Sequence, residues 1–556
     1  MRSGIFGAIG SRMITIPGLV TKSFEGLYYA VGCNKPSSLI EQSAFIETNN
    51  ETFGIHGVWL NSENHNWSES DSLLHLKEYV NDPSKFDQIE GPVQGFHFDK
   101  SAGRLLLHTD FARQHPLFYY ERDGLFAYAY SLDLLVKILR ENNVTIDADY
   151  QAASMLLTFA SILGHKTLVK GINKLMPGHS AEWTRNSLRC YPRSNPLDID
   201  RDISNPSEAI EMIDTSFREA SNRMIHLNQA FGKEQINLLS GGIDSRMVFL
   251  QTATETEKVK CLCFSAEDYL DHKISKSIAK DYGAEYLFHN LNQGEYMLNT
   301  DSVEEYDGTI NYLASAHHRH ALRSLRIPNP GLIASGQLGN EILAEFGMPN
   351  ATFESVVSSI HTYSKAFGGC RDEVESLWNN TPDSTVFKLY NRGFLYTNSA
   401  AFSTRPHGIL YSPFTSSSFV RSALRIQPDL LANHKIYLEW MRSCYPEATK
   451  YDWERYRAKP IQGVRLNAAK LKMNILSRFV YPISSFRGAS MSPIQLWYNE
   501  SKTHQEFFNR AFVDKREFLE SLPELASLVD SNYSTMSVMN KASVLTLLIG
   551  LEKYIN

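Results

Sequence analysis

The feature that most constrains the fold is a glycine turn between an apolar run and a helical segment. The apolar run is Ile236-Asn237-Leu238-Leu239, the turn is Ser240-Gly241-Gly242-Ile243-Asp244-Ser245, and residues 246–251 read as a helix. A strand that ends in such a turn and continues as a helix directs backbone N–H groups and a helix N-terminus toward one point, where phosphate oxygens bind. The turn therefore predicts a strand–helix unit with an anion-binding site.

The residue types in this turn fit nucleotide chemistry. Gly241 and Gly242 permit positive φ and close approach of a ligand. Ser240 and Ser245 add hydroxyl donors, and Asp244 offers a hard carboxylate oxygen to a divalent cation. The pattern is neither the Walker nor the dinucleotide pattern, because the lysine and the glycine spacing differ. The alternative interpretation is a serine-glycine turn that is merely capped by Asp244.

Length and composition narrow the class of protein. A chain of 556 residues is expected to form two or three domains. A hydrophobic fraction of 43% and a net charge of −6 indicate a globular protein without a nucleic-acid-binding surface. No apolar run is long enough to span a membrane, and the six scattered cysteines contain no CxxC pair. We therefore expect a cytoplasmic protein that binds neither nucleic acid nor membranes.

The first part of the chain, residues 1–195, is predicted to be mostly β. Short apolar or alternating runs recur there between turn residues, with helices expected near residues 70–79 and 131–140. Residues 4–9 are expected to form a buried first strand rather than a signal peptide, because Arg12 interrupts the apolar stretch. A proline- and serine-rich linker over residues 191–207 precedes a helix that Ser207 can cap.

The second part of the chain alternates strands and helices, which is typical of a parallel sheet. After the strand that ends at Ser240, strands are expected at residues 259–265 and 285–289, with a helix over residues 271–282 between them. Ligands bind beyond the carboxyl ends of such strands, which places Ser240, Ser265 and the motif at residues 331–341 around one crevice. Residues 350–556 are predicted to be mostly helical.

Two further groups of residues suggest metal binding but have simpler explanations. Cys261 and Cys263 share one face of a strand, where core packing is the favoured interpretation. His317, His318 and His320 cluster on a predicted helix, and we expect partly buried or surface histidines there rather than a metal site.

The Ser-Gly-Gly-Ile-Asp-Ser turn resembles the pyrophosphate-binding loop of the ATP pyrophosphatase class. Within that class, nearly the whole chain is similar to the asparagine synthetase family. The motif from Ser335 to Glu341, Ser-Gly-Gln-Leu-Gly-Asn-Glu, resembles the family's second ATP-site loop, Ser-Gly-x-Gly-x-Asp-Glu. Arg457-Ala458-Lys459 resembles its Arg-x-Lys motif. The resemblance implies that a substrate carboxylate attacks ATP, that pyrophosphate leaves an acyl-adenylate, and that an amine then forms an amide.

The resemblance also implies roles for individual residues. The implied catalytic residues are Lys459, Gln337 and Glu341, and the implied magnesium ligands are Asp244 and Asn340. Asn340 stands where the family has an aspartate, and a neutral amide is a weaker ligand for a hard cation. The implied ATP-binding residues are Leu238, Ser240, Gly241, Gly242, Asp244, Ser245, Phe264, Ser265, Ser335 and Gly336.

The N-terminal part resembles the family's glutamine amidotransferase domain. The expected fold class is thus α/β: a β-rich amidotransferase-like (Ntn-type) domain over residues 1–195, then a parallel-sheet ATP pyrophosphatase domain over residues 196–556 with a helical C-terminal part. The matching pieces are Gly4-Ile5-Phe6-Gly7, Asp110 with Pro116-Leu117-Phe118-Tyr119-Tyr120, and Pro177-Gly178-His179.

The departures from this domain concern its chemistry. Ser3, preceded by Met1-Arg2, stands where the family has an N-terminal cysteine nucleophile with a free α-amine. The family's Asn-Gly-Glu appears as His56-Gly57-Val58, and its Ser-Asp-Thr-Glu appears as Ser70-Asp71-Ser72-Leu73. We therefore predict that the domain does not hydrolyse glutamine. The alternative is that processing exposes Ser3 as a weak nucleophile.

These observations predict an ATP- and Mg²⁺-dependent amide-forming ligase for a small-molecule or peptide carboxylate. It is closest in character to family members without the N-terminal cysteine, such as β-lactam synthetases and the cyclases that close lasso peptides. A precursor peptide or a pathway protein is then an expected partner. Two alternatives stay open: an asparagine synthetase that uses ammonia or glutamine, and a catalytically impaired ATP-binding scaffold.

Overall fold

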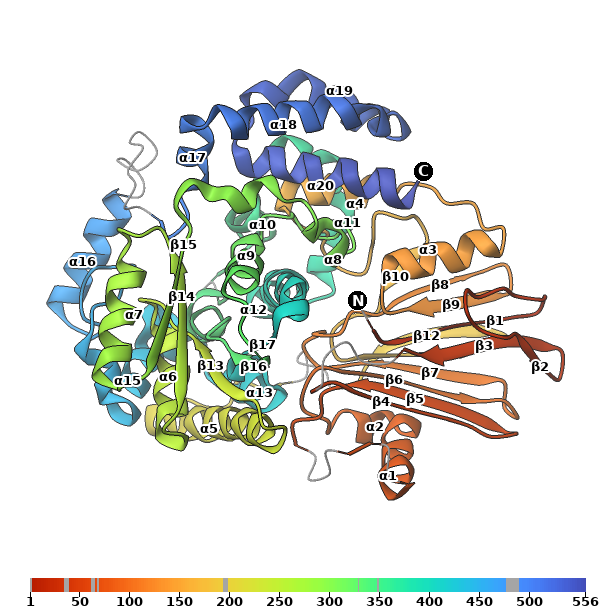
Figure 1. Cartoon of the computed structure of the whole chain (residues 1–556), viewed down its shortest axis with the longest axis horizontal. Coiled ribbons are helices and arrows are strands. Elements are labelled where there is room, and N and C mark those ends of the chain that lie inside the picture. Colours follow the sequence, from red (N-terminus) through yellow and green to blue (C-terminus); the bar gives the residue numbers. More distant parts are fainter. Residues whose placement is uncertain are drawn as a thin grey trace.

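Three β-sheets organise the part of the chain that the structure describes: two antiparallel sheets from the first 192 residues and one parallel sheet from the second part (Figure 1). The computed structural model describes residues 3–34, 40–61, 66–67, 70–193, 199–328, 330–347, 350–476 and 490–556. The segment Met1-Arg2 and the domain boundary expected between residues 195 and 196 lie outside these ranges. The expected α/β fold class, with β-rich, parallel-sheet and helical parts in that order, is confirmed.

The two antiparallel sheets pack face to face. Their strand orders are β10-β8-β9-β1-β3-β2 and β12-β11-β7-β6-β5-β4. Side chains such as Ile5, Phe96, Leu107 and Phe126 fill the space between them with no exposure to solvent. The strands are β1 (Ile5–Gly10), β2 (Lys22–Phe24), β3 (Leu27–Cys33), β4 (Gln42–Glu47), β5 (Glu51–Gly57), β6 (Val93–Asp99), β7 (Arg104–Thr109), β8 (Phe118–Arg122), β9 (Leu125–Ala129), β10 (Ile172–Lys174), β11 (His179–Thr184) and β12 (Ser187–Pro192).

Helices cover the outer faces of both antiparallel sheets. α3 (Leu132–Glu141) packs on the first sheet, and α1 (Ser70–Asn81) and α2 (Pro83–Phe86) pack on the second (Figure 1). The helices predicted near residues 70–79 and 131–140 are therefore confirmed, as is the buried first strand β1, all six residues of which are buried. The layers follow from the burial of the central strands: β1, β6 and β7 direct apolar side chains toward the neighbouring layers.

The helix after the linker, α5 (Pro206–Ala230), begins earlier than predicted. The carboxamide oxygen of Asn205 accepts hydrogen bonds from the backbone N–H groups of Ser207 (2.8 Å) and Glu208 (3.3 Å), so Asn205 is the cap. The prediction that Ser207 caps this helix was wrong. Pro206 explains the difference, because its fixed φ suits the first helical position and it has no N–H to leave unpaired.

The parallel sheet has the strand order β15-β14-β13-β16-β17. β13 is the first of these strands in the chain, and the later strands add on both of its sides. This arrangement creates a topological switch point between β13 and β16. The strands are β13 (Glu234–Leu238), β14 (Val259–Ser265), β15 (Glu285–Asn290), β16 (Pro330–Ala334) and β17 (Ile409–Tyr411). β14 has the predicted bounds, and both Cys261 and Cys263 are buried in the core.

Each face of the parallel sheet carries its own helices. α5, α6 (Ile243–Glu255) and α7 (Leu270–Asp281) pack on one face, against residues such as Leu239, Cys261 and Leu332. α9 (Ala316–Leu325) and the C-terminal helices pack on the other face, against residues such as Leu238, Phe264 and Ile333.

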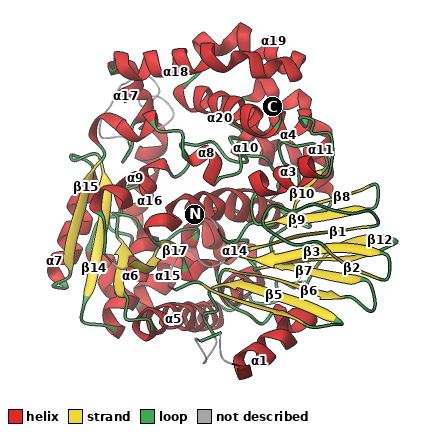
Figure 2. Ribbon diagram, turned by 45° about the vertical axis from the view of Figure 1, so that its right-hand side comes forward, coloured by secondary structure: helices red, strands yellow, loops and turns green. Residues whose placement is uncertain are grey.

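The second part of the chain ends in a largely helical region, as predicted, and Figure 2 shows its last helices above both sheet systems. Within the described residues, α20 is the last of these helices. The helices are α8 (Ser302–Glu305), α10 (Phe353–Ile360), α11 (Arg371–Asn379), α12 (Ser384–Lys388), α13 (Ser417–Arg425), α14 (Pro428–Leu431), α15 (Lys435–Cys444), α16 (Val464–Ile475), α17 (Ile494–Glu500), α18 (Lys502–Lys515), α19 (Pro523–Asn532) and α20 (Val538–Tyr554).

One helix joins the two parts of the molecule. α4 (Tyr150–Phe159) belongs to the first 195 residues, yet Leu156 and Phe159 lie in one buried cluster with Val374 and Leu547 of the C-terminal region. Figure 1 shows α4 between α20 and α10. Within the described ranges, no helix is both long and apolar enough to cross a lipid bilayer.

Candidate functional site

The two glycine motifs meet in a cavity of about 200 Å³ beyond the carboxyl ends of β13, β14 and β16. This is the switch point, where open parallel sheets bind their ligands. The residues of the predicted site that line the cavity are Leu238, Ser240, Gly242, Asp244, Ser245, Phe264, Ser335, Gly336 and Gln337. Gly241, Ser265, Asn340, Glu341 and Lys459 are not among the lining residues.

The second motif packs directly onto the first, and its glycines make this approach possible. A Cβ atom on Gly336 would lie 2.3 Å from the backbone nitrogen of Ser245 and 2.5 Å from the carbonyl carbon of Asp244. A Cβ atom on Gly339 would lie 2.9 Å from a carboxylate oxygen of Asp244. At Gly336 no side chain fits without moving the backbone of one loop, and at Gly339 it would displace the side chains of Asp244 and Phe414. The two loops therefore form one interlocked unit.

The N–H groups of the first turn are held by side-chain oxygens. The N–H of Ser240 donates to Ser245 Oγ (3.1 Å), that of Gly242 to Ser240 Oγ (3.1 Å), and that of Gly241 to Asp271 Oδ1 (2.7 Å). A phosphate must therefore exchange with these oxygens rather than meet free N–H groups. α6 begins at the turn, and its N-cap Gly242 makes no side-chain capping bond, so the helix end stays open to an anion.

Asp271 and Glu454 place two carboxyl groups beside the turn. Burial raises the pKa of Asp271 to about 6. Burial, together with the nearby Asp271, raises the pKa of Glu454 to about 7. The Glu454 Oε2 atom is buried without a partner in the described residues. Sequence reasoning missed both residues, although Asp271 was expected at the start of a helix near the crevice, because a sequence does not show where a side chain points.

Asp244 lies in a second group of oxygen ligands. Burial and then the charge of Glu341 hold the pKa of the Asp244 carboxyl well above its usual range, although Tyr437 donates a hydrogen bond to it. Burial also raises the pKa of Glu341. Asp244 therefore accepts from Tyr437 and does not cap α6, so the capping interpretation of this aspartate was wrong.

Asn340 completes this group. Its Nδ2 donates to Glu345 Oε1 (2.7 Å), while its Oδ1 is buried and has no partner among the described residues. Two crowded carboxyls and an unpaired amide oxygen form an all-oxygen donor set of the kind that Mg²⁺ prefers. Burial is the main cause of the raised pKa values of both carboxyls, and a divalent cation there would favour their charged forms. The residues present therefore fit a magnesium ion.

The segment that carries Lys459 is anchored to the first turn by an arginine that sequence reasoning missed. Arg246 on α6 is buried and donates to the carbonyl oxygens of Gly241 (3.0 Å), Ala448 (2.6 Å), Tyr451 (3.0 Å) and Asp452 (2.7 Å). Lys459 itself is exposed and lies outside the cavity wall. The structure thus brings Ser335 to the turn but does not bring Lys459 there.

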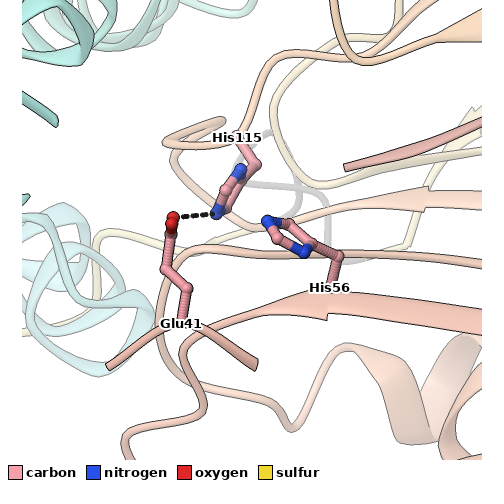
Figure 3. Close-up of side chains that lie close together, drawn as sticks. All are labelled: Glu41, His56 and His115. Atoms are coloured by element: carbon pink, nitrogen blue, oxygen red, sulfur yellow. Dashed lines mark ion pairs between the residues drawn. The ribbon is translucent and has the colours of Figure 1, made fainter. Parts of the chain in front are cut away.

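A separate buried cluster lies where the two parts of the chain meet. Figure 3 shows Glu41 and His115 paired and His56 beside them; the Glu41 oxygen and His115 Nε2 are 3.3 Å apart. Ser3 Oγ lies 3.2 Å from His56 Nε2. The ligand atoms of Glu41, His56 and His115 lie within 4.8 Å of one another, which is compatible with a metal ion.

A guanidinium group already supplies a cation to this cluster. Arg405 pairs with Glu41 and donates to His115 Nε2 (3.1 Å). Although burial raises the pKa of Glu41, the charge of Arg405 holds it well below its usual range. Burial lowers the pKa of His56 to about 4 and that of His115 to about 3, so both imidazoles are neutral at pH 7. An ion pair between the two parts of the chain, Arg405 with Glu41, accounts for the cluster without a metal.

The predicted histidine cluster is divided by the structure. His317 and His318 on α9 line the cavity. The ring of His320 instead stacks edge-on with His289 at 5.0 Å. Among the described residues, these histidines belong to no group of three ligands that could hold a metal ion.

Comparison with known proteins gives a distant likeness. No protein-family model and no curated protein matches the chain. Among solved structures, it matches a glutamine phosphoribosylpyrophosphate (PRPP) amidotransferase from B. subtilis complexed with ADP and GMP. The sequence identity is 9% and the TM-score is 0.21, and the match covers 70% of this chain and 91% of that chain. A TM-score this low carries no argument about function, which we therefore argue from the site itself.

Proposed function

We propose that the chain is an ATP- and Mg²⁺-dependent ligase that activates a carboxylate as an acyl-adenylate, releases pyrophosphate and forms an amide with an amine. One observation carries the proposal: two glycine loops interlock at the switch point of a parallel sheet, next to an oxygen cluster that fits a divalent cation. Phosphate and Mg²⁺ are the ligands that such a pair of neighbouring sites binds together.

Each part of the site has a role in this proposal. Ser240, Ser245 and the open N-terminus of α6 bind the phosphates that leave as pyrophosphate. Asp244, Asn340 and Glu341 hold Mg²⁺, which neutralises negative charge on the triphosphate when it is bound. Leu238 and Phe264 contact the nucleoside. Gly241 and Ser265 do not line the cavity, and their role is to hold the neighbouring lining residues in position. Ser335 and Gly336 are assigned to the α-phosphate, and Gln337 is assigned to the acyl group. The backbone carbonyl oxygen of Gln337 accepts a hydrogen bond from Ser412 Oγ (2.7 Å).

Lys459 needs a movement to take part. In the family it would stabilise charge at the α-phosphate, but here it lies outside the cavity wall. Its proposed role therefore requires residues 457–463 to close over the bound nucleotide. Arg457 and Gly463, at the two ends of this segment, both have positive φ angles (52° and 147°). A change of backbone dihedral angles at these two residues could move the segment as a hinge.

We propose a small-molecule or peptide carboxylate as substrate, and a precursor peptide or a pathway protein as partner. The N-terminal part supports a reaction without glutamine hydrolysis, because Ser3 is buried and bonded to His56, and Arg405 fills the adjoining cluster. A second candidate is an ATP-binding scaffold without chemistry. It is favoured by the exposed position of Lys459 and by the neutral Asn340.

Pyrophosphate release from ATP with Mg²⁺ tests the proposal. We expect release with a carboxylate substrate and amine, and a loss of at least about hundredfold in Asp244→Ala, because the variant lacks a carboxylate at the cation site. Asp429→Ala, an exposed carboxylate at the start of α14, is the matched control and should behave as wild type.

The substrates separate the candidates. Release with aspartate and ammonia identifies an asparagine synthetase, and release only with peptides supports a cyclase. Tight ATP binding without release for any substrate supports the scaffold. Release that persists in Asp244→Ala would contradict the assignment of the site.

A further inference from the structure

The cavity has two chemically different ends. One end carries the hydroxyl groups of Ser240 and Ser245 and the carboxyl of Asp244, which suit a triphosphate with its cation. Around Phe264, which contacts His317 and His318, the other lining residues are apolar except for these two imidazoles, and we take this region as the other end. It is lined by Leu238, Leu262, Phe264, Met491, His317 and His318. If the phosphates occupy the first end, the base of the nucleotide must lie at the second.

The two imidazoles are held in place by aromatic contacts. The ring of His318 lies edge-on to Phe264 with centroids 4.7 Å apart, and the ring of His317 lies 5.6 Å from the same phenyl ring. The two imidazoles are 4.3 Å from each other. These contacts fix the rings through their carbon faces and edges, and they leave the ring nitrogens for hydrogen bonding.

The ring nitrogens lack partners in the protein. His318 Nδ1 is buried and makes no hydrogen bond among the described residues, and neither imidazole has a side-chain hydrogen bond within those ranges. Buried polar groups are normally paired, because an unmade hydrogen bond costs on the order of 1–3 kcal/mol. A buried, unpaired nitrogen of His318 in a cavity wall, beside the imidazole of His317, therefore indicates a ligand that completes its bonding.

Charge decides which ligand fits. Burial lowers the pKa of His317 to about 4 and that of His318 well below its usual range, so both rings are neutral at pH 7. A neutral imidazole offers one donor and one acceptor and does not attract anions. The pair thus suits a flat, uncharged heteroaromatic group with donors and acceptors on its edge, and it does not suit a phosphate or a carboxylate.

We propose that His317 and His318 bind the edge of the nucleobase and select a purine with an exocyclic amino group. This inference rests on the proposed use of ATP. The amino group donates to an unprotonated imidazole nitrogen, and a ring nitrogen of the base accepts from the imidazole N–H. The faces of the base then contact Leu238 and Phe264.

Direct nucleotide binding tests the inference without requiring catalysis. Titration calorimetry with Mg²⁺ compares ATP with purine riboside triphosphate, which lacks the amino group. We expect the wild-type chain to prefer ATP by about tenfold, the value of one hydrogen bond in a desolvated site. In at least one of His318→Phe and His317→Phe this preference should fall toward one, because the amino group loses its acceptor. A variant that loses the donor to the ring nitrogen should instead weaken binding of both nucleotides.

Two further variants make the result decisive. His320 lies on the same helix but outside the cavity, so His320→Phe should keep the wild-type preference for ATP over the analogue. His318→Gln retains a donor and an acceptor and should restore part of it, even if the phenylalanine variants fold poorly. An unchanged preference in both phenylalanine variants would overturn the inference while leaving the ligase proposal intact. If the wild-type chain bound neither nucleotide, the proposed function would fail first, and the inference would fail with it.

Discussion

At the scale of single residues, the acids beside the glycine turn are the feature that sequence reasoning could not locate. Asp271 accepts from the N–H of Gly241, and Glu454 lies beside it with an unpaired oxygen. Two poorly solvated carboxyls next to the proposed phosphate site are costly to the fold, because desolvation and mutual repulsion disfavour their charged forms. Such cost is commonly retained where a site binds charged ligands.

The raised pKa of Asp271 predicts a pH-dependent stability. Its folded-state pKa is about 6, above the ordinary value of 3.8, so the folded chain holds this proton more tightly than the unfolded chain. The stability it contributes is present below pH 3.8 and is lost as the pH rises through about 6. Asp271→Asn keeps an oxygen for Gly241 and removes the titration.

We therefore expect Asp271→Asn to be more stable than wild type at pH 7.5, with an advantage that shrinks at pH 5 by on the order of 1 kcal/mol. Thermal unfolding of both proteins at the two pH values measures this. Asp268→Asn, an exposed neighbour in the same loop, is the control and should match wild type at both. An advantage of equal size at the two pH values would show that the carboxyl of Asp271 does not titrate as described.

At the scale of elements, the interlocked loops make the glycines of the second motif indispensable. Gly336→Ala would place a Cβ atom 2.3 Å from the backbone nitrogen of Ser245, so the two loops must separate. We expect a loss of stability of about 1–3 kcal/mol. We also expect ATP binding to weaken at least about tenfold, because a displaced loop mispositions the phosphate-binding groups.

Gly368→Ala is the matched control for this substitution, because a Cβ atom there meets nothing within 4 Å. It should change neither the unfolding midpoint nor the ATP affinity measured by titration. If Gly336→Ala bound ATP as tightly as this control does, the contact between the loops would not matter for the nucleotide.

The elements themselves were largely predictable, and their long-range contacts were not. β14 follows from its apolar run, and the glycine turns follow from Ser240 and Ser335, because these signals are local in the sequence. The cap at Asn205 was missed in favour of Ser207 because both residue types cap helices and only the backbone shows where a helix begins. The four carbonyls bound by Arg246 lie up to 206 residues away from it, beyond any local pattern.

At the scale of the whole molecule, Arg405 ties the second part of the chain to the first. Its guanidinium pairs with Glu41, contacts His115 and donates to the carbonyl oxygen of Gln114 (3.0 Å). The Glu41 side chain is only 1% exposed and that of Arg405 is 10% exposed. Removing one partner of such a pair leaves a buried charge, which costs about 3–5 kcal/mol.

We expect Arg405→Met to lower the urea midpoint of the full chain by an amount of this size. Adding Glu41→Gln should recover part of the loss, because it removes the unpaired carboxylate. Arg442→Met, which removes an exposed arginine paired with Glu439, should leave the midpoint near wild type. Equal midpoints for Arg405→Met and Arg442→Met would mean that the Arg405–Glu41 pair does not hold the two parts together.

The shared helix α4 has a consequence for how the protein is made. Its apolar face emerges from the ribosome early, but Leu547 on α20, which lies in the same buried cluster, is synthesised long after it. During translation the apolar face of α4 must therefore stay exposed until α20 has been synthesised and can cover it. We expect a nascent chain of this kind to need chaperones, or rapid synthesis and folding, until α20 has been made.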